Sequence, residues 1–137
     1  MRLSQAPYHC LAWIDHSLAR IYAVKRDEIR EIAVVHAPDR GRGHVHHHVG
    51  TPGPGHEPPA QEFLDKVVIA IGDAAEVLIA GPGEAKHALK RHAWVHAPRL
   101  ASRIVGVETI AACGARELHA FANRLFRRAD RMDAPAP

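Results

Sequence analysis

The residues with the most chemistry to offer are six histidines in one segment, residues 36–59, which also holds five of the ten glycines and five of the ten prolines. Imidazole nitrogens bind zinc, nickel and copper. On an extended segment, alternate side chains point to the same side. The segment therefore predicts a metal site, with zinc as the candidate ion, although no cofactor is required. Its ligands would be His44, His46, His48 and His56. The alternative is a polar loop that binds metal only adventitiously.

A second candidate site is a group of cations between Glu84 and Arg103. Five cations against one acid give this segment a charge of +4, whereas the whole chain carries +3. A localised basic patch indicates a polyanionic partner such as RNA. A solvated helix face is the alternative. Arg40 and Arg42, in the histidine-rich loop, are also placed to contact phosphates. The predicted RNA-binding residues are Arg40, Arg42, Lys86, Lys90, Arg91, Arg99 and Arg103.

The sequence does not indicate an enzyme. Asp15 and His16 are adjacent in a predicted turn, but no nucleophile accompanies them. The segment 81–83 (Gly-Pro-Gly) precedes a predicted helix, yet Pro82 lacks the backbone donor that an anion-binding turn needs. We interpret it as a turn between a strand and a helix.

Three strands are expected before the loop, at residues 8–15, 18–25 and 29–35. The first is almost continuously apolar, as in a strand covered on both faces. In the second, Leu18, Tyr22 and Val24 share one face and Ala19 and Ile21 share the other. Short turns connect the three, which predicts an antiparallel meander.

Helices and strands are expected to alternate after the loop. Helices are predicted at 60–75, 84–95 and 114–129, and strands at 76–80 and 103–110. Strands connected through helices run parallel with right-handed crossovers. The prediction is one α/β domain, residues 1–137, with a mixed five-stranded sheet, helices packed on it, and a frayed tail at 130–137.

Bulk composition narrows the class of protein. No run of about 18 apolar residues is present, so no membrane partner is expected. The N-terminal residues lack the apolar core of a signal peptide, which predicts a cytoplasmic protein. In that compartment Cys10 and Cys113 are expected to be reduced thiols.

Two segments resemble the middle domain of the archaeal and eukaryotic class 1 peptide-release factors and of Pelota, the ribosome-rescue relative. They are AWIDHSLARIYAV (12–24) and VLIAGPGEAKHAL (77–89). The order of elements agrees with that domain from about Tyr8 to Phe126. The chain is also similar to short bacterial stand-alone versions of the domain. The resemblance implies an RNase H-like or ribosomal-S11-like sandwich and a ribosome or tRNA as partner.

In that family the loop between the third strand and the first long helix carries Gly-Gly-Gln. The corresponding loop here has Gly41 and Gly43 but no such motif. We therefore predict a translation-associated factor without peptide-release activity, whose loop becomes ordered against a partner. The alternatives are a metal-binding protein and an interaction module without chemistry of its own.

Overall fold

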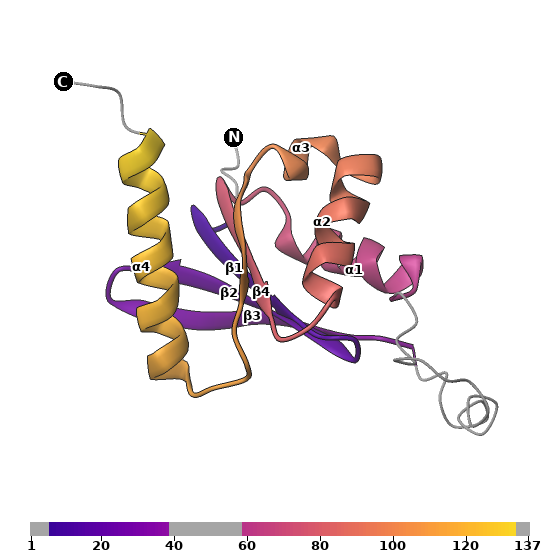
Figure 1. The fold of residues 1–137 in the computed structure, drawn as a ribbon, viewed down its shortest axis with the longest axis horizontal. Coiled ribbons are helices and arrows are strands. Elements are labelled where there is room, and N and C mark those ends of the chain that lie inside the picture. Colours follow the sequence, from indigo (N-terminus) through magenta and orange to yellow (C-terminus); the bar gives the residue numbers. More distant parts are fainter. Residues whose placement is uncertain (1–5, 39–58, 134–137) are drawn as a thin grey trace, which may run out of the picture.

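The computed structural model describes residues 6–38 and 59–133, and its centre is one five-stranded sheet (Figure 1). The strands are β1 (His9–Ile14), β2 (Leu18–Lys25), β3 (Glu28–His36), β4 (Glu76–Gly81) and β5 (Ile104–Thr109). Their order across the sheet is β3-β2-β1-β4-β5. The first three pair antiparallel, whereas β4 runs parallel to both β1 and β5. The predicted mixed α/β sheet is confirmed.

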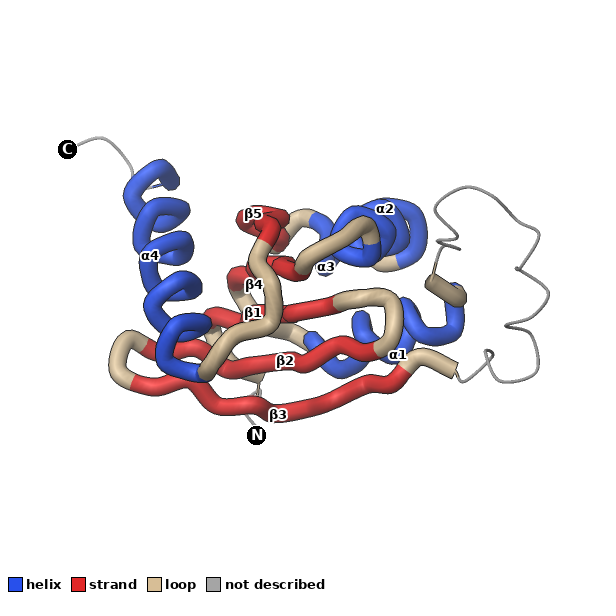
Figure 2. Tube along the Cα trace, turned by 60° about the horizontal axis from the view of Figure 1, so that its bottom comes forward, coloured by secondary structure: helices blue, strands red, loops and turns tan. Residues whose placement is uncertain are grey.

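Helices cover both faces of this sheet, as Figures 1 and 2 show. The helices are α1 (Gln61–Ile71), α2 (Ala85–His96), α3 (Pro98–Ala101) and α4 (Ala115–Asp133). On one face, α1, α2 and α3 pack on alternate residues of β1 such as Ala12 and Ile14. On the other face, α4 packs on Leu11 and Trp13. None of the described helices has the length and apolar composition needed to cross a membrane.

Three helices differ from the prediction. Helix α1 ends at Ile71, four residues before its predicted end, because Gly72 adopts a left-handed backbone at φ 66°. Pro98 does not simply end the second helix; it starts the separate one-turn helix α3, since proline is tolerated in a first turn. Helix α4 continues to Asp133, four residues beyond its predicted end and into the tail that was expected to be frayed. The added residues include Arg131 and Met132, which favour helix, and no proline occurs before Pro135.

The predicted turn after β1 is held by the Asp15 carboxylate. Its Oδ1 accepts hydrogen bonds from the Ser17 amide at 2.8 Å, the Leu18 amide at 2.9 Å and the Ser17 hydroxyl at 3.0 Å. Burial alone would raise the pKa of Asp15, but these hydrogen bonds outweigh it and hold the pKa below its usual value.

We expect the Asp15→Ala variant to be less stable by about 1–2 kcal/mol near neutral pH, because three donors lose a charged acceptor. The folded-state pKa is depressed, so this stabilisation is present above the unfolded-state pKa and is lost as the pH falls through the folded-state pKa. Urea denaturation should therefore show the difference from wild type shrinking between about pH 7 and about pH 3. Asp27→Ala, in the exposed turn before β3, is the control. An equal loss at both pH values would contradict this role of the carboxylate.

Candidate nucleic-acid interface

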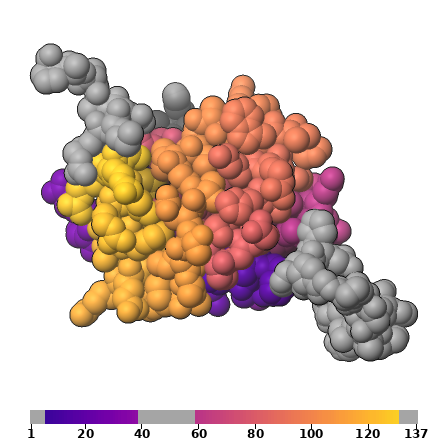
Figure 3. All heavy atoms as spheres, viewed as in Figure 1, coloured from indigo at the N-terminus to yellow at the C-terminus, as the bar shows by residue number. Residues whose placement is uncertain are grey.

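Helix α2 has one buried and one exposed face. Its buried residues follow helical spacing: Ala85, Lys86, Ala88, Leu89, His92 and Ala93. The intervening positions Lys90, Arg91 and Trp94 point to solvent, and the Trp94 side chain is 63% exposed. Figure 3 shows α2 and α3 on the surface of the molecule.

The orientation of α2 is held by a polar contact on its buried face. His92 Nε2 lies 2.7 Å from Asp65 Oδ1 of α1, and the His92 side chain is almost fully buried. The His92 ring also contacts the ring of His96, with 4.7 Å between centroids and a tilt of 42° between the ring planes. Because this contact turns His92 toward α1, the helical period turns Lys90, Arg91 and Trp94 away from the core.

The predicted basic segment does not form one continuous patch. Lys86 is 4% exposed, and its Nζ donates a hydrogen bond of 2.6 Å to the Gly83 carbonyl, so it stabilises the turn before α2. Arg103 Nη2 donates a hydrogen bond to the Gly72 carbonyl after α1 at 3.0 Å.

Three cations of that segment remain at the surface: Lys90 and Arg91 on α2, and Arg99 on α3. Among the described residues, none of these three side chains takes part in an ion pair. Lys90 and Arg91 lie one helical turn before the exposed Trp94. Arg99 is on α3, which packs against α2. We call Lys90, Arg91, Trp94 and Arg99 the α2–α3 surface.

Trp94 was not among the predicted RNA-binding residues. Its signal in the sequence is its spacing, three and four residues after Arg91 and Lys90, which puts all three on one side of a helix. The second tryptophan, Trp13, is 7% exposed, and its Nε1 donates a hydrogen bond of 3.2 Å to the Ile110 carbonyl. One tryptophan therefore belongs to the core and the other to the surface.

The other predicted site residues lie outside the described part of the chain. They are Arg40, Arg42, His44, His46, His48 and His56. The loop therefore stays a prediction, both as a zinc site and as an RNA contact. Its two ends are described: His36 closes β3 and is exposed, and Pro59 precedes α1.

A different group of possible metal ligands occurs within the described residues. His9 is the first residue of β1, Glu76 is the first residue of β4, and Asp130 lies near the C-terminal end of α4. The sequence analysis did not single out any of them. The free thiols Cys10 and Cys113 are not part of this group; Cys10 is buried, and burial raises its pKa to about 12.

Solved structures of two Pelota proteins and of a translation termination factor share this fold. Pelota from Archaeoglobus fulgidus aligns with a TM-score of 0.64 and 15% identity over 93% of this chain and 35% of its own. An archaeal translation termination factor, aRF1, aligns with a TM-score of 0.59 and 16% identity over 90% of this chain and 38% of its own. Thermoplasma acidophilum Pelota aligns with a TM-score of 0.53 and 17% identity over 93% of this chain and 39% of its own.

The predicted resemblance is therefore confirmed at the level of the fold. The chain spans well under half the length of these proteins, so it corresponds to one part of each. No protein-family profile matches the sequence, and no curated protein matches it significantly.

Proposed function

We propose that this protein is a translation-associated factor that binds ribosomal RNA or tRNA through the α2–α3 surface. The observation that carries the proposal is that the exposed cations Lys90 and Arg91 share one side of α2 with the exposed indole of Trp94. A third exposed cation, Arg99, lies on the adjoining helix α3.

This combination of side chains suits RNA. Cations with no competing carboxylate can contact phosphates, which supply most of the sequence-independent affinity. An exposed indole can stack on an unpaired base, a contact worth about 1–3 kcal/mol. A cationic face that only keeps a helix soluble has no need of an aromatic ring, and tryptophan is on average a highly buried residue.

The choice of a translation-related RNA rests on the fold. The structural neighbours include a translation termination factor, and they share this fold over at least 90% of this chain. We further propose that the factor does not release nascent peptide, because the sequence contains no Gly-Gly-Gln tripeptide. Arg40 and Arg42 would add phosphate contacts from the loop.

Sedimentation of the purified protein with ribosomes at several salt concentrations tests the proposal. Three phosphate contacts predict that the logarithm of the binding constant falls with the logarithm of salt concentration with a slope of about −2 to −3, and additional contacts from the loop would steepen it. Binding to isolated tRNA, measured by fluorescence anisotropy, separates the two RNA partners, and quenching of Trp94 emission reports stacking in either case.

The control is a W13F background, in which Trp94 is the remaining tryptophan and its emission can be assigned. Absence of binding to both ribosomes and tRNA at low salt would refute the proposal. Binding without a salt dependence would refute the phosphate contacts and favour an interaction with a ribosomal protein.

A further inference from the structure

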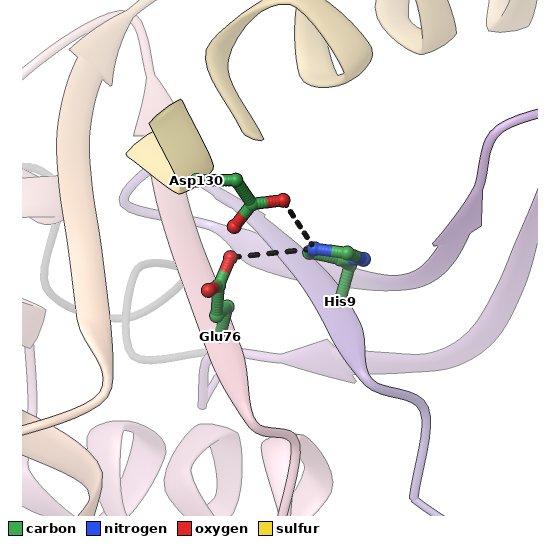
Figure 4. Close-up of side chains that lie close together, drawn as sticks. All are labelled: His9, Glu76 and Asp130. Carbon is green, nitrogen blue, oxygen red and sulfur yellow. Dashed lines mark ion pairs between the residues drawn. The ribbon is translucent and has the colours of Figure 1, made fainter. Parts of the chain in front are cut away.

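The side chains of His9, Glu76 and Asp130 converge at one edge of the sheet, beneath the C-terminal part of α4 (Figure 4). His9 and Glu76 are paired residues at the start of the parallel strands β1 and β4, so their side chains leave the same face of the sheet. That is the face which α4 covers. Asp130 lies four residues after Phe126, and therefore one turn further along the buried stripe of α4.

Each of the three residues stands where the pattern of its element calls for an apolar side chain. Along β1, His9 precedes the buried Leu11 on the same face. Along β4, Glu76 precedes the buried Leu78. The apolar layer between α4 and the sheet thus ends in one imidazole and two carboxylates. The imidazole and the two carboxylates at these positions are all groups that can coordinate a metal ion.

The two distances from His9 are within the range of ion pairs but longer than a charge-assisted hydrogen bond. His9 Nε2 lies 3.3 Å from Glu76 Oε1 and 3.6 Å from Asp130 Oδ2, and the three ligand atoms all lie within 4.8 Å of one another. A charge-assisted hydrogen bond is about 2.7–2.9 Å long. The imidazole–carboxylate contact elsewhere in this molecule, between His92 and Asp65, has that length, 2.7 Å.

Ligands around a tetrahedral ion are farther apart than hydrogen-bonded atoms. Bonds of about 2.0–2.1 Å to zinc place neighbouring ligands about 3.3 Å from each other. Nε2 of His9 is buried and makes no hydrogen bond within the described residues. Its ring is held between the ring of Phe126, at 4.5 Å between centroids, and the ring of Tyr8, at 4.8 Å, so Nε2 stays directed at the two carboxylates.

From this geometry we propose that His9, Glu76 and Asp130 bind a divalent transition-metal ion, with Zn²⁺ the ion that the two distances from His9 fit. Two carboxylates and a neutral imidazole supply a charge of −2 to a dication. Asp130 is half exposed, which leaves an entry path and room for water as the fourth ligand. The ion would fasten the end of α4 to β1 and β4. Its three residues differ from the ligands predicted in the histidine-rich loop and from the residues of the α2–α3 surface.

The test must distinguish this site from the loop histidines, which also bind Zn²⁺. We therefore specify the full-length chain with the loop histidines replaced by serine (H44S, H46S, H47S, H48S and H56S). We expect this background to bind one equivalent of Zn²⁺ by isothermal titration calorimetry. A free Zn²⁺ concentration 100 times the dissociation constant should raise its melting temperature by roughly 5–10 °C.

Substitutions of the three ligands should weaken Zn²⁺ binding at least tenfold and abolish the thermal shift. The variants are H9Q, E76Q and D130N. Because Asp130 is a partly exposed helix residue, D130N is expected to fold even if the other two variants do not. The matched controls H87Q and D73N alter a histidine and an aspartate outside the cluster and should leave both readings unchanged. A Zn²⁺-dependent shift of the His9 imidazole ¹⁵N resonances would identify the ligand directly.

A background protein that binds no Zn²⁺ at millimolar concentration would overturn the proposal. So would undiminished binding and an undiminished thermal shift in D130N.

Discussion

Replacing Gly81 with alanine should destabilise the protein by about 3 kcal/mol or more, or prevent it from folding. Gly81 is the last residue of β4 and lies beside Ile14, the last residue of β1. A Cβ atom at this position would lie 2.0 Å from the Ile14 carbonyl oxygen. That atom belongs to the backbone of a fully buried residue. It cannot move aside as the end of a long side chain can.

The backbone of Gly81 is also held from the other side, since its carbonyl accepts a hydrogen bond of 3.1 Å from the Ile110 amide. Relief of the clash would require β1 and β4 to separate, which would break the centre of the sheet. A domain of this size has a total stability of about 5–15 kcal/mol, so the loss is a large part of it.

Gly83→Ala is the matched control, because it adds the same methyl group two residues later and would meet no atom within 4 Å. Urea denaturation followed by circular dichroism would measure both variants, with soluble yield as a second reading. A Gly81→Ala protein within about 0.5 kcal/mol of wild type would show that β1 and β4 do not approach as closely as described.

Reversing two charges on α2, with Lys90→Glu and Arg91→Glu together, should weaken RNA binding at low salt by about 100-fold. The double substitution changes the charge of the α2–α3 surface by four units. Each unit contributes up to about 1 kcal/mol at contact distance in water, and 100-fold corresponds to about 2.7 kcal/mol. The slope of the logarithm of the binding constant against the logarithm of salt concentration should also become less negative by about 1.4 to 1.8, because two phosphate contacts are lost.

The chain supplies a matched control in Lys25 and Arg26. They are also an adjacent, exposed Lys-Arg pair, but they lie at the turn between β2 and β3. Lys25→Glu with Arg26→Glu changes the net charge equally, so it separates a local contact from a general loss of positive charge. Anisotropy with tRNA and sedimentation with ribosomes would compare the two double variants. Equal losses in both would mean that net charge, and not the α2–α3 surface, governs binding.

Lys86→Met gives a further comparison within the same helix. Because the Lys86 side chain is buried against Gly83, its replacement should change the free energy of unfolding but leave the salt dependence of RNA binding as it is. This would separate the cation that serves the fold from the cations that we propose serve RNA.

The elements of this fold were predicted well because their signals are local. Alternation alone divides the residues of β2 between two faces. Ala19 and Ile21 are on the face that α1 covers, and Tyr22 and Val24 are on the face that α4 covers. The turn at Asp15 follows from side chains that bond their own backbone. Helix ends were less predictable. The end of α4 depends on where a chain of good helix formers stops, and no strong stop signal precedes Pro135.

A run of charges in the sequence need not form one patch in space. Five cations between residues 86 and 103 suggested one surface. The helix turns Lys86 inward and Lys90 and Arg91 outward, and the fold draws Arg103 toward Gly72. The period of the helix is enough to predict that Lys86 faces inward while Lys90 and Arg91 face outward. The contact of Arg103 with Gly72 depends on how β5 and α1 are arranged.

Composition, periodicity and turn residues by themselves determined the class of fold, the alternation of its strands and the exposed position of Trp94. The tertiary structure alone brought together His9, Glu76 and Asp130, which lie 67 and 54 residues apart along the chain. Their meeting depends on the parallel register of β1 with β4 and on the rotation of α4 about its axis. Both are set by the packing of the whole apolar core, so no local stretch of sequence contains them.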